Sequence, residues 1–574
     1  MNKYQELKIK VNQAKGPISI LFWTGILLQI VSFGTLVFLI DYNKVVLLFK
    51  LIKTTSILKI KWHKISMLNW HWSLVLLLSF AAYFLLIPLK SFLLKDKKAD
   101  VGTEEKVVRG TKLEDIKKYK KEVRDKEIFC NLGGIVPVPI DIIYNHFKII
   151  GAQGTGKTQA IARMINETVQ FLFNWIILDI KNDYTGWFYN PETDIIFNPT
   201  DTRCPAWNIL DEIENKADIS LLVNAVVPDI PNDANGIWVR DARQVLESII
   251  YYLKMTGQGT NEKLIECCHL APAELVKLFK SKPEIEKSCS LAIPHLQAGE
   301  KVTPILMSVV ASHVKAFDVM PSQPDRPGMK TFNIRRDFLS KKGVKIFLNS
   351  NENTKDMVRP ILTIFVEFVS RKLLAAKKGE NNTTIIALDE FSALNKIEAI
   401  IDLEDKGRDK GVVVILGIQD YGKTTDKYGE NLLRTIINNL RNSLWLQVAD
   451  EKLAKIISDE IGVQEVERYT ESDSVGANND QYTNTQSTQI VQKQAILPST
   501  IMSFKNFEGI VKLVGTAFFH VHIIPITNTY KIIAEPFILS DRMKIMNVGV
   551  QKPGLDDRAE LNKEEEEFPL TYGN

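Results

Sequence analysis

Residues 151–158 read GAQGTGKT, and this loop constrains the fold more than any other stretch of the chain. The apolar run FKII at 147–150 precedes it, and a helical pattern over residues 158–170 follows it. A glycine-rich loop that leaves a strand and opens a helix with Lys-Thr is typical of phosphate-binding loops. We therefore predict an α/β fold that binds ATP at the carboxyl ends of its strands.

The residue types of this loop match the chemistry of a bound triphosphate. Gly154 and Gly156 allow tight turns, so that successive backbone N–H groups can point at phosphate oxygens. Lys157 would place a cation between the β- and γ-phosphates, and the Thr158 hydroxyl would ligate Mg²⁺. The residues predicted to bind the nucleotide are Gly151, Gly154, Thr155, Gly156, Lys157 and Thr158.

A second motif should supply carboxylates for the metal ion and for the attacking water. Residues 383–394 read TTIIALDEFSAL, an apolar strand that ends in Asp389 and Glu390. We predict that Asp389 reaches Mg²⁺ and that Glu390 polarises the water. The run VVVILGIQD at 412–420 brings Gln419 to another carboxyl end. There it would sense the γ-phosphate, or it would equally be a satisfied polar loop residue.

Six apolar runs alternate with helical stretches and are typical of buried strands. They are WIILDI (175–180), DIIF (194–197), VKIFLN (344–349), IIALD (385–389), VVVILG (412–417) and LWLQV (444–448). Several are apolar throughout, as strands covered on both faces are, which predicts a doubly wound, mostly parallel sheet. Residues 211 to about 325 carry helical patterns and predict an all-α insertion, whereas the polar residues 472–489 predict a flexible loop.

Two long uncharged runs precede the nucleotide loop. Residues 17–40 carry no charged side chain, and residues 70–89 contain no Asp, Glu, Lys or Arg. Each is long enough to cross a hydrocarbon core of ~30 Å, which needs about 20 residues. The first run is too long for a signal peptide and lacks a cleavage site. We therefore predict two transmembrane helices, at about 17–40 and 70–90, rather than buried core helices.

The charges around these runs leave the orientation of the helices open. Residues 1–100 contain fourteen lysines against four acidic residues, a net charge of +10. Six of those lysines lie between the two runs and oppose the positive-inside rule. Because a nucleotide site needs cytoplasmic ATP, we place both termini on the cytoplasmic side of the membrane.

The large domain is not generally basic, since residues 101–574 sum to a net charge of −6. A DNA partner would therefore bind local patches, such as Lys277, Lys280 and Lys282, mainly through backbone contacts. The five cysteines show no disulfide framework and indicate a reducing compartment. A zinc site around Cys267 and Cys268 is disfavoured against buried helical thiols, because adjacent cysteines chelate one ion poorly.

Several blocks of the sequence resemble the TraD/TraG-like coupling proteins of type IV secretion and conjugation, and above all the TraD and TrwB branch. The blocks are RGTKL (109–113), HFKIIGAQGTGKT (146–158), LDIKNDY (178–184), FNPTDTRCPAWNIL (197–210), WVRDAR (238–243), IIALDEFSAL (385–394), KGRDKGVVVILGIQD (406–420) and ILPST (496–500). Their order and spacing are more specific than any one motif. The chain departs from the family's pattern at Asn145, where some relatives have arginine, and at Ile180, where many have proline.

The resemblance implies a RecA-like P-loop motor domain with an inserted all-α domain, preceded by the two transmembrane helices. Family members assemble as hexameric rings at the inner membrane and pump single-stranded DNA towards the secretion channel. By position, Arg408 matches the arginine that they present to a neighbouring subunit's nucleotide, where it would stabilise charge on the transferring phosphoryl group. The residues alone would favour a surface arginine in a charged helix.

Five domains follow from these patterns. They are a membrane domain (1–100), the N-terminal part of the nucleotide-binding domain (101–210), the all-α domain (211–325), the C-terminal part of the nucleotide-binding domain (326–545) and an acidic tail (546–574). The tail would dock on a basic partner or be a plain solvated tail.

The function that we predict is an ATPase that translocates relaxase-bound single-stranded DNA to a conjugative secretion channel. A receptor that delivers protein effectors to a type IV secretion system without pumping DNA would use the same motor, and it stays an alternative. Two short spans and the helical insertion argue against a chromosome-handling motor of the FtsK/HerA kind.

Overall fold

The computed structural model describes residues 106–228, 236–299, 301–379, 382–475, 482–526 and 530–543. The chain divides into two compact units, residues 1–104 and 105–574, and every described residue belongs to the second. The two predicted transmembrane segments and the acidic tail therefore lie outside the described residues. Within the described ranges, no helix combines the length and the apolar character that crossing a membrane requires.

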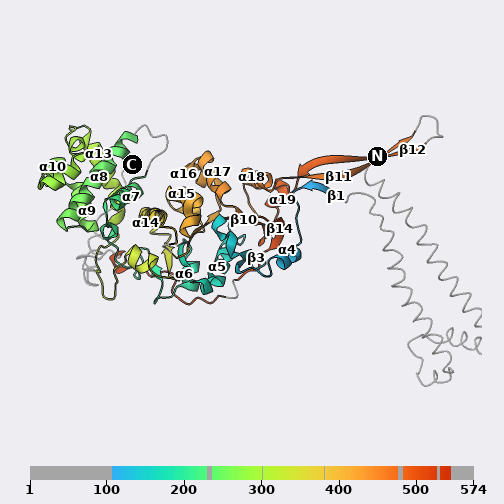
Figure 1. Ribbon diagram of the computed structural model, residues 1–574, viewed down its shortest axis with the longest axis horizontal. Coiled ribbons are helices and arrows are strands. Elements are labelled where there is room, and N and C mark those ends of the chain that lie inside the picture. Colours follow the sequence, from blue (N-terminus) through green and yellow to red (C-terminus); the bar gives the residue numbers. More distant parts are fainter. Residues whose placement is uncertain are drawn as a thin grey trace, which may run out of the picture. The chain divides into compact units, whose positions relative to one another are not determined.

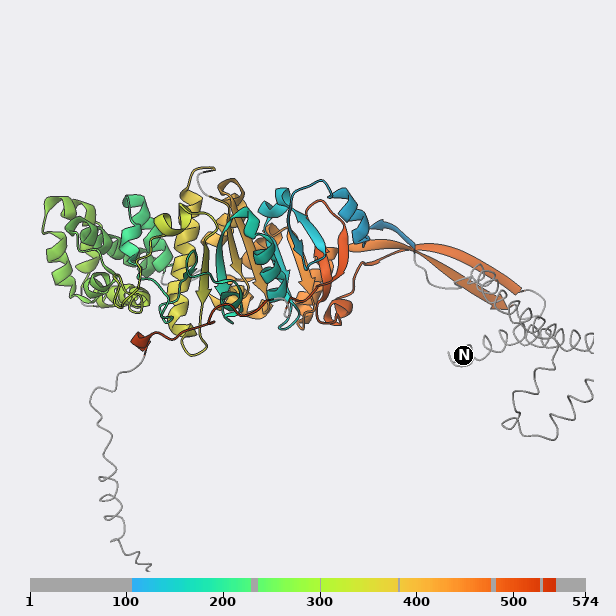
Figure 2. The same ribbon diagram turned by 90° about the horizontal axis from the view of Figure 1, so that it is seen from below.

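A nine-stranded sheet forms the centre of the described unit. Figures 1 and 2 show where the labelled strands and helices of this unit lie. The strand order of the sheet is β14-β13-β10-β4-β9-β8-β5-β7-β6. The strands are β4 (Phe147–Ile150), β5 (Asn174–Asp179), β6 (Ile195–Ile196), β7 (Lys345–Asn349), β8 (Thr384–Leu388), β9 (Val412–Ile418), β10 (Asn442–Leu446), β13 (Glu508–Lys512) and β14 (Phe518–His522). Neighbours from β10 to β6 are parallel, while β13 is antiparallel to β10 and to β14. The predicted α/β fold with a mostly parallel sheet is confirmed.

Both faces of the central strands are buried. In β5, Trp175 and Ile177 belong to one apolar cluster, while Ile176 and Leu178 belong to another on the opposite face. A strand covered on both sides has no solvent face, which is why these strands are apolar at most positions rather than at alternate ones. The ends of the strands are therefore the parts of the sheet that are left for chemistry.

Helices make the two layers that cover the sheet. One layer contains α4 (Ile116–Glu122), α5 (Lys157–Glu167) and α6 (Asp183–Phe188), with the hairpin of β2 (Ile128–Leu132) and β3 (Val136–Pro139). The other contains α14 (Lys355–Ala375), α15 (Ala399–Lys406), α16 (Tyr421–Tyr428), α17 (Glu430–Asn439), α18 (Glu451–Ile461) and α19 (Pro498–Met502).

A helical region interrupts the sheet between β6 and β7. Its helices are α7 (Lys216–Val226), α8 (Gly236–Thr256), α9 (Asn261–His269), α10 (Pro272–Phe279), α11 (Pro283–Cys289), α12 (Ala292–Leu296) and α13 (Thr303–Val314). Figure 1 shows them gathered beyond α14, at one end of the sheet. One apolar cluster continues from the sheet into these helices, so the region shares its core with the sheet. The predicted helical insertion is confirmed, while its boundaries at 211 and 325 stay a prediction.

Residues 472–489, predicted as a flexible loop, belong largely to a long β-hairpin. Strand β11 (Val463–Val475) pairs antiparallel with β12 (Tyr482–Gln494), and β1 (Lys106–Gly110) pairs with the other edge of β11. Figure 2 shows the hairpin projecting beyond the sheet. The loop prediction is wrong because it rested on the lack of apolar residues. A strand needs alternating apolar residues only where one of its faces is buried.

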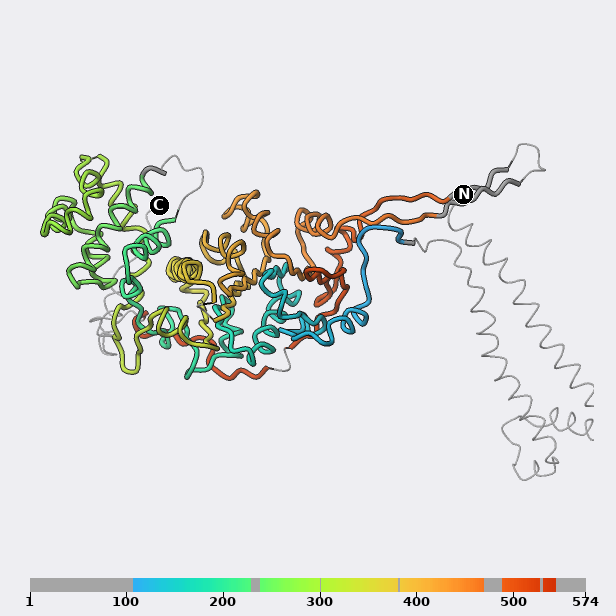
Figure 3. The backbone as a smooth tube through the Cα atoms, in the orientation of Figure 1, coloured from blue at the N-terminus to red at the C-terminus, as the bar shows by residue number. Residues whose placement is uncertain are grey.

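The described C-terminal residues 530–543 run back along the unit as an extended strap, which Figure 3 traces at the red end of the colour bar. The Ile533 N–H donates to Gly186 O in α6 at 2.9 Å. The Arg542 guanidinium donates to Val319 O, just after the helices of the insertion, at 3.3 Å. The strap therefore ties the layer that carries α5 and α6 to the helical region.

Candidate nucleotide site

The glycine-rich loop joins β4 to α5 at the carboxyl edge of the sheet. Gly154 and Gly156 have φ values of +79° and +117°, which residues with side chains rarely adopt. The Thr155 hydroxyl donates to Ala152 O at 2.8 Å and closes the turn from within. The loop thus has the backbone of a phosphate-binding turn, and it opens a helix of 11 residues whose N-terminus favours anions.

Lys157 lies folded against its own loop. Its ammonium donates to Gly151 O at 2.7 Å and to Ala152 O at 2.9 Å, and the side chain is buried. Burial lowers the pKa of Lys157 to about 8, although the charge of Asp389 opposes this shift. The two carbonyl contacts keep the cation beside the loop, where it can exchange them for phosphate oxygens.

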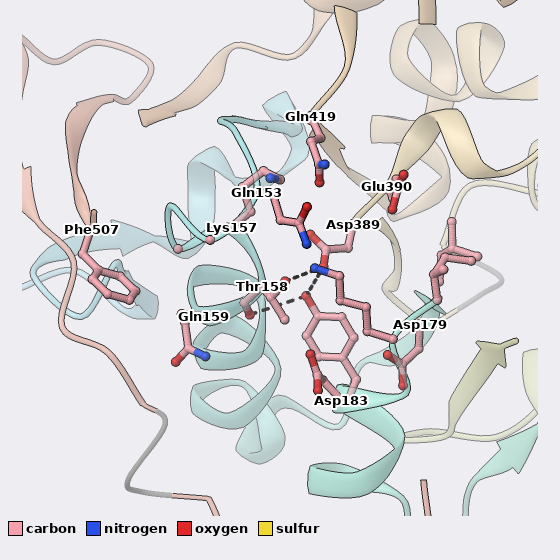
Figure 4. A pocket seen from close by; sticks show the side chains of 16 residues that line it. Gln153, Lys157, Thr158, Gln159, Asp179, Asp183, Asp389, Glu390, Gln419 and Phe507 are labelled. Atoms are coloured by element: carbon pink, nitrogen blue, oxygen red, sulfur yellow. Dashed lines mark hydrogen bonds between the residues drawn. The ribbon is translucent and has the colours of Figure 1, made fainter. Parts of the chain in front are cut away.

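Asp389 follows β8 and accepts two hydrogen bonds on one oxygen. The Thr158 hydroxyl donates to Asp389 Oδ2 at 2.8 Å, and the Tyr184 hydroxyl donates to the same atom at 3.0 Å. Figure 4 shows Thr158 and Asp389 in this pocket. Burial raises the pKa of Tyr184 well above its ordinary value, so the hydroxyl stays protonated and remains a donor.

The second oxygen of Asp389 fits a metal ligand. Within the part of the chain that the structure describes, the buried Oδ1 atom has no hydrogen-bond partner. A buried carboxylate oxygen without a partner costs free energy unless a cation faces it. Beside the Thr158 hydroxyl, it completes a set of hard oxygen donors of the kind that Mg²⁺ prefers. The two residues therefore fit the ligand roles predicted for them.

Gly417 in β9 explains how Asp389 reaches this position. A Cβ at Gly417 would lie 2.0 Å from Asp389 O, so β9 can pass the end of β8 only where it has no side chain. Glu390 and Gln419, which follow β8 and β9, are half-buried and line the same pocket. Figure 4 shows both on the Asp389 side of the pocket. The predicted residues that the fold brings together are Gly154, Gly156, Lys157, Thr158, Asp389, Glu390 and Gln419.

Arg408 does not join this group in its own chain. It is exposed in the short turn Gly407–Lys410, which precedes β9. The pocket lies at the other end of β9. This strand has 7 residues and extends over about 20 Å at the usual rise per residue. Arg408 therefore does not line the pocket of its own chain.

Further residues of the pocket were not singled out from the sequence. They are Gln153, Gln159, Lys181, Asp183, Tyr184 and Phe507. Asp179, buried at the end of β5, accepts from the Thr185 N–H at 2.6 Å and from its hydroxyl at 2.7 Å. These contacts fix the start of α6 and so place Tyr184. The block LDIKNDY, a strand end followed by charges, was a signal that could have found Lys181, Asp183 and Tyr184.

The cysteine and lysine clusters of the helical region lie away from the pocket. All five cysteines are free and buried, and burial raises the pKa of Cys267 to about 11. Among the described residues, no three His, Cys, Asp or Glu side chains are grouped as metal ligands. Lys277, Lys280 and Lys282 are exposed at the end of α10 and the start of α11. These lysines are therefore accessible to an anionic partner.

Comparison with known proteins gives a family match over most of this unit. The model of the type IV secretion-system coupling protein DNA-binding domain matches residues 130–525. Coupling protein TraD of Escherichia coli (strain K12) is 24% identical over 387 residues, which are 65% of this chain and 52% of TraD. The chain thus spans about half the length of that relative.

Solved structures of the conjugative coupling protein TrwB have the same fold. TrwBΔN70 in its unbound monoclinic form aligns with a TM-score of 0.62 at 21% identity, over 76% of this chain and 99% of that one. TrwB in complex with ADP and Mg²⁺ aligns with a TM-score of 0.61 at 22% identity, over 76% and 98%. The likeness defines an α/β NTPase fold with a helical region.

Proposed function

This chain belongs to the TraD/TrwB family of type IV secretion coupling proteins, and we propose that it is an ATP-driven motor that delivers relaxase-bound single-stranded DNA to a conjugative secretion channel. The observation that carries the proposal is the pocket that unites Lys157, Thr158 and Asp389 at the carboxyl edge of the sheet. Phosphoryl transfer from a nucleoside triphosphate is the chemistry that such groups serve.

Nucleotide binding uses the groups of the loop. The backbone N–H groups of residues 151–158 and the N-terminus of α5 contact the phosphates, and Lys157 gives up its contacts with Gly151 O and Ala152 O to reach them. Thr158 and Asp389 hold Mg²⁺. When bound, that ion neutralises charge on the β- and γ-phosphates.

Hydrolysis needs a base and a stabilising cation. The Glu390 carboxylate accepts a proton from the attacking water, and the Gln419 amide orients groups at the γ-phosphate end. The Arg408 guanidinium comes from a neighbouring copy, because its own pocket is about 20 Å away. The complete site therefore requires an assembly of copies, and a RecA-like homo-hexameric ring is the arrangement that we propose.

The motor works from the cytoplasmic side of the bacterial inner membrane. Residues 1–100 anchor it there through two helices, and the motor domain, interrupted by an all-α domain at 211–325, extends into the cytoplasm. Contacts to DNA are mainly to the backbone, since a motor has to move along any sequence. The relaxase and components of the secretion channel are its protein partners.

Single-stranded DNA is expected to raise steady-state ATP hydrolysis several-fold at low salt, and the stimulation should fall as salt rises, because phosphate contacts release counterions. The measurement uses the full-length chain with and without an oligonucleotide of mixed sequence. A rate of hydrolysis that does not change when DNA is added would favour the receptor that delivers protein effectors. A chain that hydrolyses no ATP at all would contradict both functions.

Replacing Tyr184 by phenylalanine is expected to raise the Mg²⁺ concentration for half-maximal hydrolysis by about 10-fold. A loss of metal affinity of this size is typical when a residue that supports a metal ligand is replaced. The change keeps the ring and removes the hydroxyl that donates to Asp389 Oδ2 at 3.0 Å. Titration of Mg²⁺ at saturating ATP measures the effect. The matched control is Tyr119→Phe. The hydroxyl that this change removes donates to Pro137 O at 3.2 Å in the same layer. If both variants keep the wild-type Mg²⁺ requirement, Tyr184 does not position Asp389.

A further inference from the structure

Phe507 has an unusual backbone beside the nucleotide loop. Its φ is +68°, which bulky residues rarely adopt. Its N–H donates to Thr155 O in the loop at 3.1 Å, and its carbonyl accepts from the Ile523 N–H at 2.6 Å. These two contacts hold the residue against the loop in spite of the disfavoured conformation.

The ring of Phe507 lies on the loop at the residue before Lys157. A Cβ at Gly156 would be 2.9 Å from Phe507 Cδ1, so ring and backbone are in direct contact. The side chain is half-buried, and none of the aromatic pairs among the described residues includes it. Phe507 therefore presents apolar ring surface to a pocket that is otherwise lined largely by polar groups.

Gln159 adds a fixed polar group to the same side of the pocket. Its side chain is buried, and its Oε1 atom accepts from the Ile526 N–H at 2.8 Å. Only the oxygen of an amide can accept, so this contact leaves the Nε2 hydrogens for another partner. Figure 4 shows Gln159 and Phe507 on the side of the loop away from Asp389 and Glu390.

The direction of a bound triphosphate decides what reaches Phe507. Asp389, Glu390 and Gln419 mark the γ-phosphate end of the pocket, since they carry the groups for metal, base and water. A chain of phosphates held by the loop and Lys157 must then extend its nucleoside towards the opposite side. We propose that Phe507 and Gln159 form the nucleobase subsite, in which the Phe507 ring stacks on the face of the base.

The proposed subsite recognises an aromatic base rather than a particular purine. Stacking uses the π face that every base has, so it adds affinity without choosing strongly between adenine and guanine. The inference rests on the proposed function, because it requires that the loop binds a nucleoside triphosphate. It also gives a reason for an aromatic residue at a φ that a glycine would adopt at no cost.

The test compares a ligand with a base and a ligand without one. Isothermal titration calorimetry of the full-length chain with Mg²⁺ measures the binding of ATP and of inorganic tripolyphosphate. Phe507→Gly removes the ring and relieves the backbone, so it should weaken ATP binding on the order of 10-fold, the usual loss for one stacked base. Binding of tripolyphosphate should not change, since its contacts are those of the loop.

Two further variants separate stacking from support of the loop. Phe507→Trp keeps an aromatic face and should keep ATP affinity. Leu172→Gly relieves a comparable φ of +51° at an exposed position outside the pocket, and it should change neither affinity. Equal weakening of ATP and tripolyphosphate by Phe507→Gly, or no weakening of ATP, would overturn the subsite alone. A wild-type chain that binds neither ligand would overturn the proposed function together with it.

Discussion

Replacing Lys157 by alanine is expected to lower ATP hydrolysis by about 10²- to 10³-fold, the loss that follows removal of one charge-stabilising donor from an active site. The ammonium is the charged group of the loop itself, held at 2.7 Å from Gly151 O and 2.9 Å from Ala152 O. A buried amine whose pKa is lowered to about 8 gains most when an anion replaces neutral carbonyls as its partner. Steady-state phosphate release from the full-length chain measures the loss.

The matched control for this change is Lys427→Ala. Lys427 also donates to two backbone carbonyls, those of Ser392 and Leu394, but it lies outside the nucleotide pocket. The Lys427→Ala protein should therefore keep near-wild-type hydrolysis, although it loses a comparable set of contacts. A Lys157→Ala protein that retains more than about a tenth of wild-type activity would show that this loop is not where the reacting phosphates bind.

The strands of the sheet and the nucleotide loop could be predicted because their signals are local. A strand covered on both faces is apolar at most positions, and the loop needs its glycines, lysine and threonine at fixed spacing. The position of Asp389 could be predicted as well, since a carboxylate at the end of an apolar strand lies at the carboxyl edge of a parallel sheet. The confirmed part of the fold follows from these two rules.

The parts that could not be predicted depend on contacts between distant segments. Tyr184 matters because α6 brings its hydroxyl to Asp389, 205 positions away in sequence. Phe507 comes to the loop only because its N–H pairs with Thr155 O and β13 adds to the sheet antiparallel. The hairpin of β11 and β12 is held by backbone pairing between polar strands, which leaves no pattern of alternating apolar residues to read.

Arg408 illustrates the limit of a single chain. The family resemblance assigns it to a neighbour's nucleotide, whereas the residues around it favour an exposed arginine. Its position before β9 excludes a role in the pocket of its own chain. The same position agrees both with a contact to a neighbour's nucleotide and with a surface arginine that has no such role. The two interpretations differ only in an assembly, so the decisive experiment has to mix copies.

Replacing Arg408 by alanine is expected to lower hydrolysis by the assembled protein by about 10³-fold or more, the range found for arginines supplied between subunits, with ATP binding unchanged. The physical reason is that a guanidinium from outside the pocket stabilises charge that develops only as the phosphoryl group transfers. Phosphate release at saturating ATP measures the loss. Lys406→Ala is the matched control, because it removes another exposed cation of the same segment, one paired with Asp402 at 2.8 Å.

Mixing Arg408→Ala with Lys157→Ala copies then tests whether the arginine acts between copies. In a head-to-tail assembly, an interface where the first variant supplies the loop and the second supplies Arg408 has every wild-type group. Random mixing in equal amounts makes roughly a quarter of the interfaces of this kind, so activity should return from two inactive proteins. Variants that assemble together and stay inactive would exclude a role between copies, and an active Arg408→Ala protein would make this residue the plain surface arginine that its neighbours in sequence suggest.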